Sequence, residues 1–300
     1  MDFTFALPVF LVTLREGVEA ALVIGIVLAC LSKANASSLN RFVYIGVTLG
    51  ITVSIALGLC LVLSLQSLGL SDWNYAPVAE QAVKGGVALV AIALLSWMLV
   101  WMTKQAKTLK HEVIQSVEAS LNGGNGWGIF TLIFVAVLRE GVETVLFVGS
   151  QMQQGWSPVL GAVAGLAGAS MIGILIFQGG IRINLKVFFQ FMGFVLLLII
   201  SGLVITALRK FESSIFLMGQ MNLGPLNWCQ QPVNSCILGR QVWDLSAVLP
   251  DRQFPGLVLK ALFGYTQQLY LVQAIGYLVI FLGVGSMYWY SLRQSDPARP

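Results

Sequence analysis

The chain has 300 residues, of which 57% are hydrophobic and only 10% are charged, and its mean hydropathy is +0.83. This composition excludes an ordinary soluble domain, because so few charged residues cannot cover the surface of a soluble protein of this size. We therefore expect a protein embedded in membrane lipid. The net charge of +4 then indicates how the loops are oriented, and predicts no nucleic-acid partner.

The first level of organisation is a series of apolar stretches. A helix needs about 20 apolar residues to cross a bilayer, and seven stretches of the chain meet this length. They cover residues 4–31, 42–65, 78–103, 127–150, 158–179, 186–208 and 270–292. The sequence thus predicts an all-α, polytopic membrane protein with seven transmembrane helices.

Lysine and arginine residues gather in alternate loops, beginning with the loop after the first stretch. They are Lys33, Arg41, Lys104, Lys107, Lys110, Arg182, Lys186 and Arg293. Loops rich in these residues stay on the cytoplasmic side of a membrane. We therefore expect an N-terminus outside the cell and a C-terminus in the cytoplasm, in a plasma or inner membrane.

An internal repeat divides the chain. The string LREGVE occurs at Leu14–Glu19 and again at Leu138–Glu143. In each half the next span carries small residues at four-residue spacing: Gly46, Gly50, Ser54 and Gly58, then Gly161, Gly165, Ala169 and Gly173. We expect residues 1–121 and 122–208 to form a 3+3 inverted repeat, followed by an outer loop at 209–268 and a seventh helix at 269–292. Transporters with such repeats bind substrate near the midplane.

Each LREGVE string places three charged residues midway along a predicted span. The two glutamates of a string lie three positions apart, so they share a helix face. A charge that faces lipid at this depth costs about 3 kcal/mol, so we expect all of these side chains to face the protein interior. Four carboxylates then meet there, and carboxylates suit hard di- or trivalent cations. The predicted ligands are Glu16, Glu19, Glu140 and Glu143, with Arg15 and Arg139 as their partners when the site is empty.

Other interpretations of these strings remain open. Arg15–Glu19 and Arg139–Glu143 could be ion pairs that only hold the helices together, or the carboxylates could form a proton relay. The same ligands would also suit another hard cation, such as manganese, or a membrane-embedded subunit with a redox metal. Di-metal carboxylate sites normally include histidine, and the sole histidine lies outside the predicted spans.

The strings Arg15-Glu16-Gly17-Val18-Glu19 and Arg139-Glu140-Gly141-Val142-Glu143 resemble the R-E-G-x-E signature that oxidase-dependent iron permeases carry in the first and fourth of seven spans. The resemblance extends through Ser96-Trp97-Met98 and residues 104–121, 242–246 and 261–265. It implies a high-affinity iron uptake permease, a transporter and not an enzyme, without a prosthetic group, in which the four glutamates bind iron.

The same resemblance implies an outer partner that oxidises Fe(II) to Fe(III). This partner is a periplasmic cupredoxin-like protein together with a haem peroxidase in bacterial relatives, and a multicopper oxidase in fungi. The chain lacks the paired acidic motif in its outer loop and the acidic tail of the fungal members. The bacterial branch therefore fits it better.

Several weaker candidates lie outside the spans. Asp244 and Asp251 in the outer loop are predicted to attract cations at the mouth of the pathway, or else to hold turns. The segment Lys104–Leu121 predicts an amphipathic helix on the cytoplasmic surface, where His111, Glu112 and Glu118 would receive departing iron or form a solvated face. Cys229 and Cys236 predict a disulfide if the outer loop faces an oxidising compartment, and otherwise free thiols or a weak metal pair.

Overall fold

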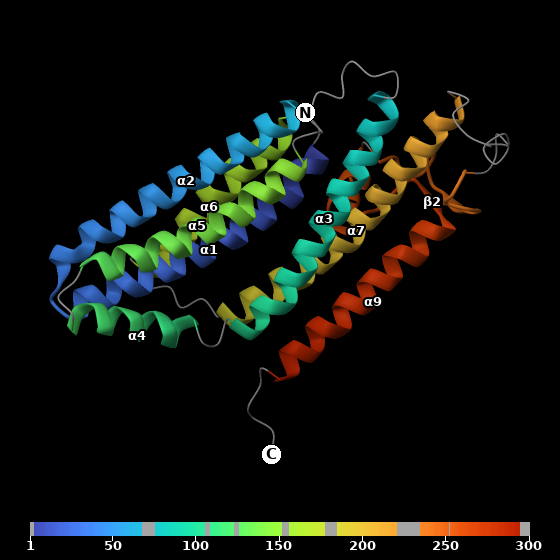
Figure 1. Cartoon of the computed structure of the whole chain (residues 1–300). Coiled ribbons are helices and arrows are strands. Elements are labelled where there is room, and N and C mark those ends of the chain that lie inside the picture. Colours follow the sequence, from blue (N-terminus) through green and yellow to red (C-terminus); the bar gives the residue numbers. More distant parts are fainter. Residues whose placement is uncertain are drawn as a thin grey trace. The chain divides into compact units, whose positions relative to one another are not determined.

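The computed structural model describes residues 3–67, 76–105, 109–122, 126–151, 156–177, 185–220, 235–251 and 253–294, and nearly all of these are helical (Figure 1). In chain order the elements are α1 (Phe3–Lys33), η1 (Ser37–Leu39), α2 (Asn40–Ser67), α3 (Ala76–Gln105), α4 (Leu109–Asn122), α5 (Gly126–Gln151), α6 (Ser157–Phe177), α7 (Leu185–Gln220), β1 (Gln241–Asp244), α8 (Gly256–Phe263), β2 (Gln268–Tyr270) and α9 (Leu271–Gln294).

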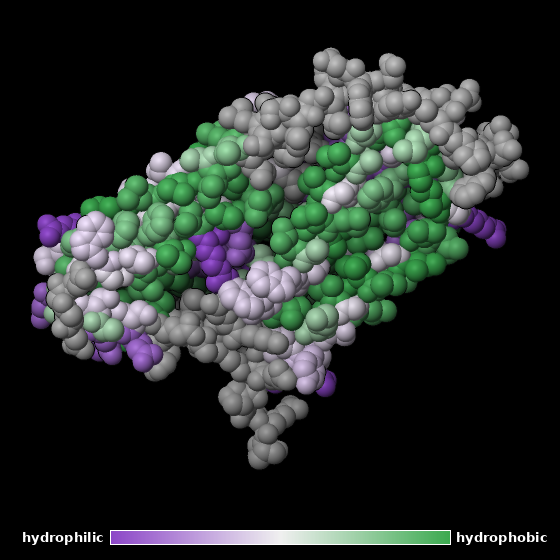
Figure 2. All heavy atoms as spheres, in the orientation of Figure 1, coloured by the Kyte–Doolittle hydropathy of each residue, from purple (hydrophilic) through white to green (hydrophobic). Residues whose placement is uncertain are grey.

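Within the described residues, five helices contain a stretch long and apolar enough to cross a membrane. These stretches are Ser37–Cys60, Pro77–Met102, Ser157–Phe177, Val187–Gly219 and Leu271–Arg293. α1 and α5 have 31 and 26 residues and are as apolar as these helices, but each carries the three charged residues of an LREGVE string, more than any of the five stretches has within its apolar window. On the face that Figure 2 shows, hydrophobic side chains predominate along the helices, with a hydrophilic group among them and others near the ends. Such a surface suits lipid and not water, so the chain is a membrane protein.

The described chain divides into two units. One comprises α2, α4, α5, α6, nearly all of α1 and the last residues of α3 from Met102, and the other comprises α8, α9, both strands and most of α3 and α7. Both LREGVE strings lie in the first unit, so the site can be described within that unit alone.

In the first unit, α1 packs against α6 through the glycines of the second small-residue ladder. A Cβ atom added at Gly161 would lie 2.3 Å from the carbonyl oxygen of Ala6, and one at Gly165 would lie 1.9 Å from Oγ1 of Thr13. Contacts this short exclude any side chain larger than hydrogen. The glycines therefore allow the two helix backbones to approach closely, as small residues do in membrane bundles.

α2 packs against α5 in a corresponding way. When the two LREGVE strings are aligned, Ala6, Thr13, Gly17 and Ala21 of α1 correspond to Phe130, Val137, Gly141 and Val145 of α5. The first four contact Gly161, Gly165, Ala169 and Gly173, and the second four contact Gly46, Gly50, Ser54 and Gly58, in the same order. Each of these four contacts between α1 and α6 thus has a counterpart between α5 and α2.

α4 closes one end of the first unit. Its Val113 and Val117 pack into a buried aliphatic cluster with residues of α1, α2 and α5, namely Val23, Val27, Leu31, Val43, Ile129, Ile133 and Val137. Figure 1 shows α4 at the end of the unit where α1 ends and α2 begins. The amphipathic helix predicted at Lys104–Leu121 is present from Leu109, and residues 106–108 lie outside the described residues. Its apolar face packs against protein.

In the second unit, α3 and α9 both pack on α7. A Cβ atom at Gly85 of α3 would lie 3.0 Å from the ring of Phe211, and one at Gly193 of α7 would lie 2.5 Å from Oη of Tyr288. The hydroxyl of Ser214 donates a hydrogen bond of 3.1 Å to the carbonyl oxygen of Val78. These contacts place α7 between the other two long helices of its unit.

α7 continues to Gln220, whereas the apolar pattern predicted an end near residue 208. The additional turns carry polar side chains that find partners in the following segment. Nη2 of Arg209 donates to Oγ1 of Thr266 at 2.8 Å, and the carboxylate of Glu212 accepts hydrogen bonds from the backbone N–H groups of Cys236 and Ile237 at 2.5 and 2.9 Å. Tertiary contacts therefore extend the helix beyond its apolar span.

The segment predicted as an outer loop contains a small folded structure. β1 pairs antiparallel with β2, with Gln241 opposite Tyr270, Trp243 opposite Leu269 and Asp244 opposite Gln268. This two-stranded sheet departs from the all-α prediction. Its four- and three-residue strands are too short to produce a recognisable alternation of polar and apolar residues.

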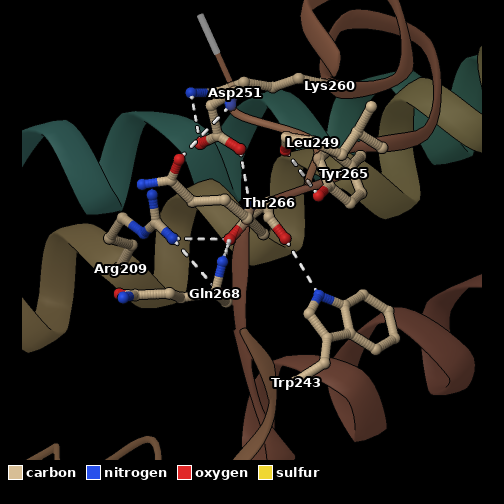
Figure 3. Close-up of polar contacts among 9 residues, drawn as sticks. Arg209, Trp243, Leu249, Asp251, Lys260, Tyr265, Thr266 and Gln268 are labelled. Atoms are coloured by element: carbon tan, nitrogen blue, oxygen red, sulfur yellow. Dashed lines mark hydrogen bonds and ion pairs between the residues drawn. The ribbon is translucent and has the colours of Figure 1, made fainter. Parts of the chain in front are cut away.

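Figure 3 shows the polar contacts that hold this segment together. The carboxylate of Asp251 accepts a hydrogen bond from the backbone N–H of Gln267 at 2.6 Å and pairs with Nζ of Lys260 at 3.0 Å. Nε1 of Trp243 donates to the carbonyl oxygen of Thr266 at 3.1 Å. The segment is thus fixed by its own side chains and by Arg209 of α7.

Candidate metal centre

The two LREGVE strings meet inside the first unit. Glu16 and Glu19 on α1 and Glu140 on α5 each offer a carboxylate oxygen, and these three oxygens all lie within 4.8 Å of one another. Opposite oxygen ligands of one cation lie about 4–5 Å apart at metal–oxygen distances of about 2.1–2.5 Å. The three carboxylates are therefore spaced for a single ion.

Arg15 neutralises part of the charge of the first string. Its Nη1 lies 3.3 Å from Oε1 of Glu16, and its Nε lies 3.2 Å from Oε1 of Glu19. The exposed fractions are 4% for the Arg15 side chain, 1% for Glu16 and 12% for Glu19. Arg15 also donates to Sδ of Met102, a neighbour that the sequence pattern does not indicate.

The second string forms the same ion pair between its arginine and its last glutamate, but its side chains are less buried. Nε of Arg139 lies 3.2 Å from Oε1 of Glu143, and these side chains are 33% and 26% exposed. Glu143 is not part of the three-carboxylate group. Identical strings therefore play unequal parts here: the first contributes two carboxylates to the group and the second contributes one.

Three buried oxygens of the group have no hydrogen-bond partner within the described residues. They are Oε2 of Glu16, Oε1 of Glu19 and Oε2 of Glu140. Oε1 of Glu19 is near enough to Arg15 for an ion pair, but the angle is not that of a hydrogen bond. A buried polar atom without a partner costs about 1–3 kcal/mol. The arrangement is therefore suited to a ligand that takes oxygen donors, such as a hard cation.

The glycine of each string lies at a close helix contact. A Cβ atom at Gly17 would lie 2.5 Å from Cβ of Ala169, and one at Gly141 would lie 2.1 Å from Oγ of Ser54. Oγ of Ser54 also lies 3.5 Å from the carbonyl oxygen of Leu138. The glycine thus lets a neighbouring helix pack directly against the turn that carries the glutamates, a role that the sequence analysis did not assign to it.

The two outer aspartates both have protein partners. Asp251 is 6% exposed and is held by Lys260 and Gln267. Asp244 is exposed, and its carboxylate accepts hydrogen bonds from Ser246 and Gln268. The hydrogen bonds from the side chain and backbone of Ser246, followed by that from Gln268, lower the pKa of Asp244 below its usual 3.8.

The remaining predicted residues are only partly described. The side chains of His111 and Glu112 lie outside the described residues, whereas Glu118 is exposed on α4. Cys236 is disulfide-bonded, and its predicted partner Cys229 lies outside the described residues.

Sequence reasoning missed two buried polar contacts of the second unit. Gln273 is fully buried, and its Nε2 donates to the carbonyl oxygen of Ile205 at 3.3 Å. Arg209 binds both Thr266 and the carbonyl oxygen of Gln268. The sequence could have indicated these contacts, because each involves a polar residue within or next to an apolar span.

The model of the Iron permease FTR1 family matches residues 6–292 of the chain. An uncharacterized protein of Synechocystis sp. is 42% identical over 294 residues, which cover 97% of this chain and 96% of that protein. The ferrous iron permease EfeU of Escherichia coli O6:H1 is 32% identical over 262 residues, 86% of each chain. EfeU of Yersinia pestis is 27% identical over 283 residues, 91% of this chain and 92% of its own. No solved structure matches. The chain belongs to the iron permease FTR1 family.

Proposed function

We propose that this membrane transporter carries iron into the cell and binds it at Glu16, Glu19 and Glu140. The observation that supports this most directly is the meeting of three carboxylate oxygens within 4.8 Å, each residue with a buried oxygen that lacks a hydrogen-bond partner. The ferrous iron permeases among its relatives favour iron over the other hard cations that such ligands accept. The family also indicates a transporter rather than an enzyme.

Glu143 completes the proposed ligand set during transport. The resemblance of the second string to the family signature assigns it to iron, and in this conformation Arg139 holds it at 3.2 Å. Arg15 and Arg139 then compensate the carboxylates while no ion is bound. Such pairing is needed because a buried charge without a partner is costly.

We propose seven spans arranged as a 3+3 inverted repeat, with 1–121 and 122–208 as the two repeats. The matched contacts of α1 with α6 and of α5 with α2 support this arrangement. The basic loops support an outer N-terminus and a cytoplasmic C-terminus. Buried carboxylates lower the hydropathy of α1 and α5, and charges that face a bundle interior are compatible with a span.

The orientation assigns the loop segments to the two sides. The segment 209–268 would face outward, where Cys229 is the proposed partner of Cys236 and where an oxidising partner would deliver iron. Asp244 and Asp251 would line the outer surface, with Asp251 primarily holding its segment together through Lys260. His111, Glu112 and Glu118 would face the cytoplasm, where departing iron is released.

Radiolabelled iron uptake tests the proposed site in cells that lack other iron permeases and contain the cognate oxidising partner. Glu16→Gln and Glu140→Gln should abolish uptake at matched membrane expression, because each removes a negative ligand. Glu80→Gln is the matched control, since Glu80 is 56% exposed and pairs with Lys84; it should transport normally.

Excess manganese should leave uptake unchanged. Wild-type uptake in both site variants would refute the site, and competition by manganese would point to a broader cation substrate.

A further inference from the structure

The site face of α1 continues as a row of aliphatic side chains. Val23 follows Glu19 by four positions, and Val27 and Leu31 follow at the same spacing. Residues spaced in this way share one face of a helix. The three aliphatic side chains are 7%, 0% and 0% exposed.

The site face of α5 continues in the same way toward the beginning of that helix. Val137 precedes Glu140 by three positions, and Ile133 and Ile129 precede it by two and three turns. These side chains are 6%, 0% and 0% exposed. They belong to the same buried cluster as the row on α1, so the two rows face each other beyond the carboxylates.

α4 completes this cluster. Its Val113 and Val117 are 5% and 0% exposed and pack with both rows. The nine buried side chains of the cluster are all aliphatic. A charged ion loses its hydration in such a constriction without gaining ligands, and for this reason apolar constrictions stop ions. An ion that left the carboxylates along these two rows would therefore meet a packed apolar cluster.

We propose that α4 is the inner gate of the transporter, which must move away from α5 before iron can leave the carboxylates toward the cytoplasm. This inference rests on the proposed function and orientation. α4 has only 14 residues and joins the cluster through Val113 and Val117. α1 and α5, in contrast, are each held along their length by backbone contacts at glycines of α6 and α2.

A reversible cross-link tests the gate. A Cβ atom at Gly128 of α5 would lie 3.2 Å from Cβ of Ser120 on α4, slightly closer than the 3.5–4.5 Å usual between bonded cysteines. A Ser120→Cys/Gly128→Cys variant should therefore form a disulfide after small adjustments when cells are treated with a membrane-permeant thiol oxidant. Iron uptake should fall to the background of cells without the transporter, and dithiothreitol should restore it. Each single-cysteine variant, treated identically, is the control and should keep its uptake.

The outcomes separate the gate from the function itself. If the cross-linked variant transports iron as well as its reduced form, the gate is refuted while the proposed function stands. If wild-type protein transports no iron in the presence of its partner, the proposed function fails.

Labelling of a buried cysteine decides the matter if the double variant is inactive even when reduced. Val27→Cys, in a background with Cys30 and Cys60 replaced by alanine, should react slowly with N-ethylmaleimide at rest, because Val27 is 0% exposed. Its reaction should accelerate when iron and the partner are supplied, since opening of α4 exposes the aliphatic cluster. An equal rate with and without iron would refute the gate.

Discussion

Among single residues, the glycine of each LREGVE string shows how a transport motif serves both chemistry and packing. Gly17 lies between Glu16 and Glu19 in sequence and against Ala169 of α6 in space. Gly141 has the same relation to Ser54 of α2. The string thus combines the carboxylates with a glycine that permits close packing of the helix on its neighbour.

Gly17→Ala should destabilise the protein by about 1–3 kcal/mol, as overpacking a tight interior does. The added methyl group would lie 2.5 Å from Cβ of Ala169, and the helices must separate to admit it. Thermal unfolding of purified protein in detergent measures the effect. Ala169→Gly in the same chain should recover much of the loss.

Gly283→Ala is the matched control, because no heavy atom lies within 4 Å of the added methyl group. Alanine in a helix interior is favoured over glycine by roughly 0.5–1 kcal/mol, so this variant should unfold at an unchanged or slightly higher temperature. Equal unfolding temperatures for the Gly17 and Gly283 variants would refute the packing explanation.

At the scale of elements, the long helices follow from apolar length, whereas the short elements depend on tertiary contacts. α2, α3, α6 and α9 begin and end within a few residues of the predicted stretches. α7 exceeds its predicted stretch because Arg209 and Glu212 bind the next segment. β1 pairs with a strand far along the chain, and no local pattern indicates such a partner.

The β1–β2 pair should lose stability in acid through Asp244. Hydrogen bonds from Ser246 and Gln268 favour the ionised carboxylate and lower its folded-state pKa below the usual 3.8. A group with a lowered folded pKa contributes stability above its unfolded pKa and loses that contribution as pH falls through the folded value. Amide hydrogen exchange in β1, corrected for the intrinsic effect of pH, should therefore accelerate on acidification below pH 3.8.

Asp244→Asn removes the ionisation and serves as the comparison. Its β1 amides should exchange faster than those of the wild type near neutral pH, because the charge-assisted hydrogen bonds are lost. They should also show a smaller change across the acidic range. The same acid response in wild type and variant would show that Asp244 does not control the stability of the strand pair.

At the scale of the whole molecule, the sequence predicted the components of the site but not their unequal use. Two identical strings within apolar helices indicated buried carboxylates, and three of the four predicted glutamates meet. Glu143 pairs with Arg139 as Glu19 pairs with Arg15, yet it lies outside the group, and the neighbouring helices differ: Ser54 packs on Gly141 where Ala169 packs on Gly17. Two identical strings do not reveal which residues of the neighbouring helices will pack against them, so this difference could not be predicted from the strings.

The proposed topology makes α1 and α5 spans although each carries three charges. Cysteines introduced at Ser38, after α1, and at Ser157, after α5, test both helices in a background in which Cys30 and Cys60 are replaced by alanine. If both helices span the membrane and the N-terminus is outside, a membrane-impermeant maleimide should label Ser157→Cys in intact cells. Ser38→Cys should react only after the membrane is permeabilised.

A second site on each side, Val248→Cys outside and Arg293→Cys inside, controls for local access, since Val248 is 80% exposed. Labelling of Ser38→Cys and Ser157→Cys from the same side would contradict the seven-span arrangement. The two cysteines are separated by spans two to four, an odd number of crossings that must place them on opposite faces.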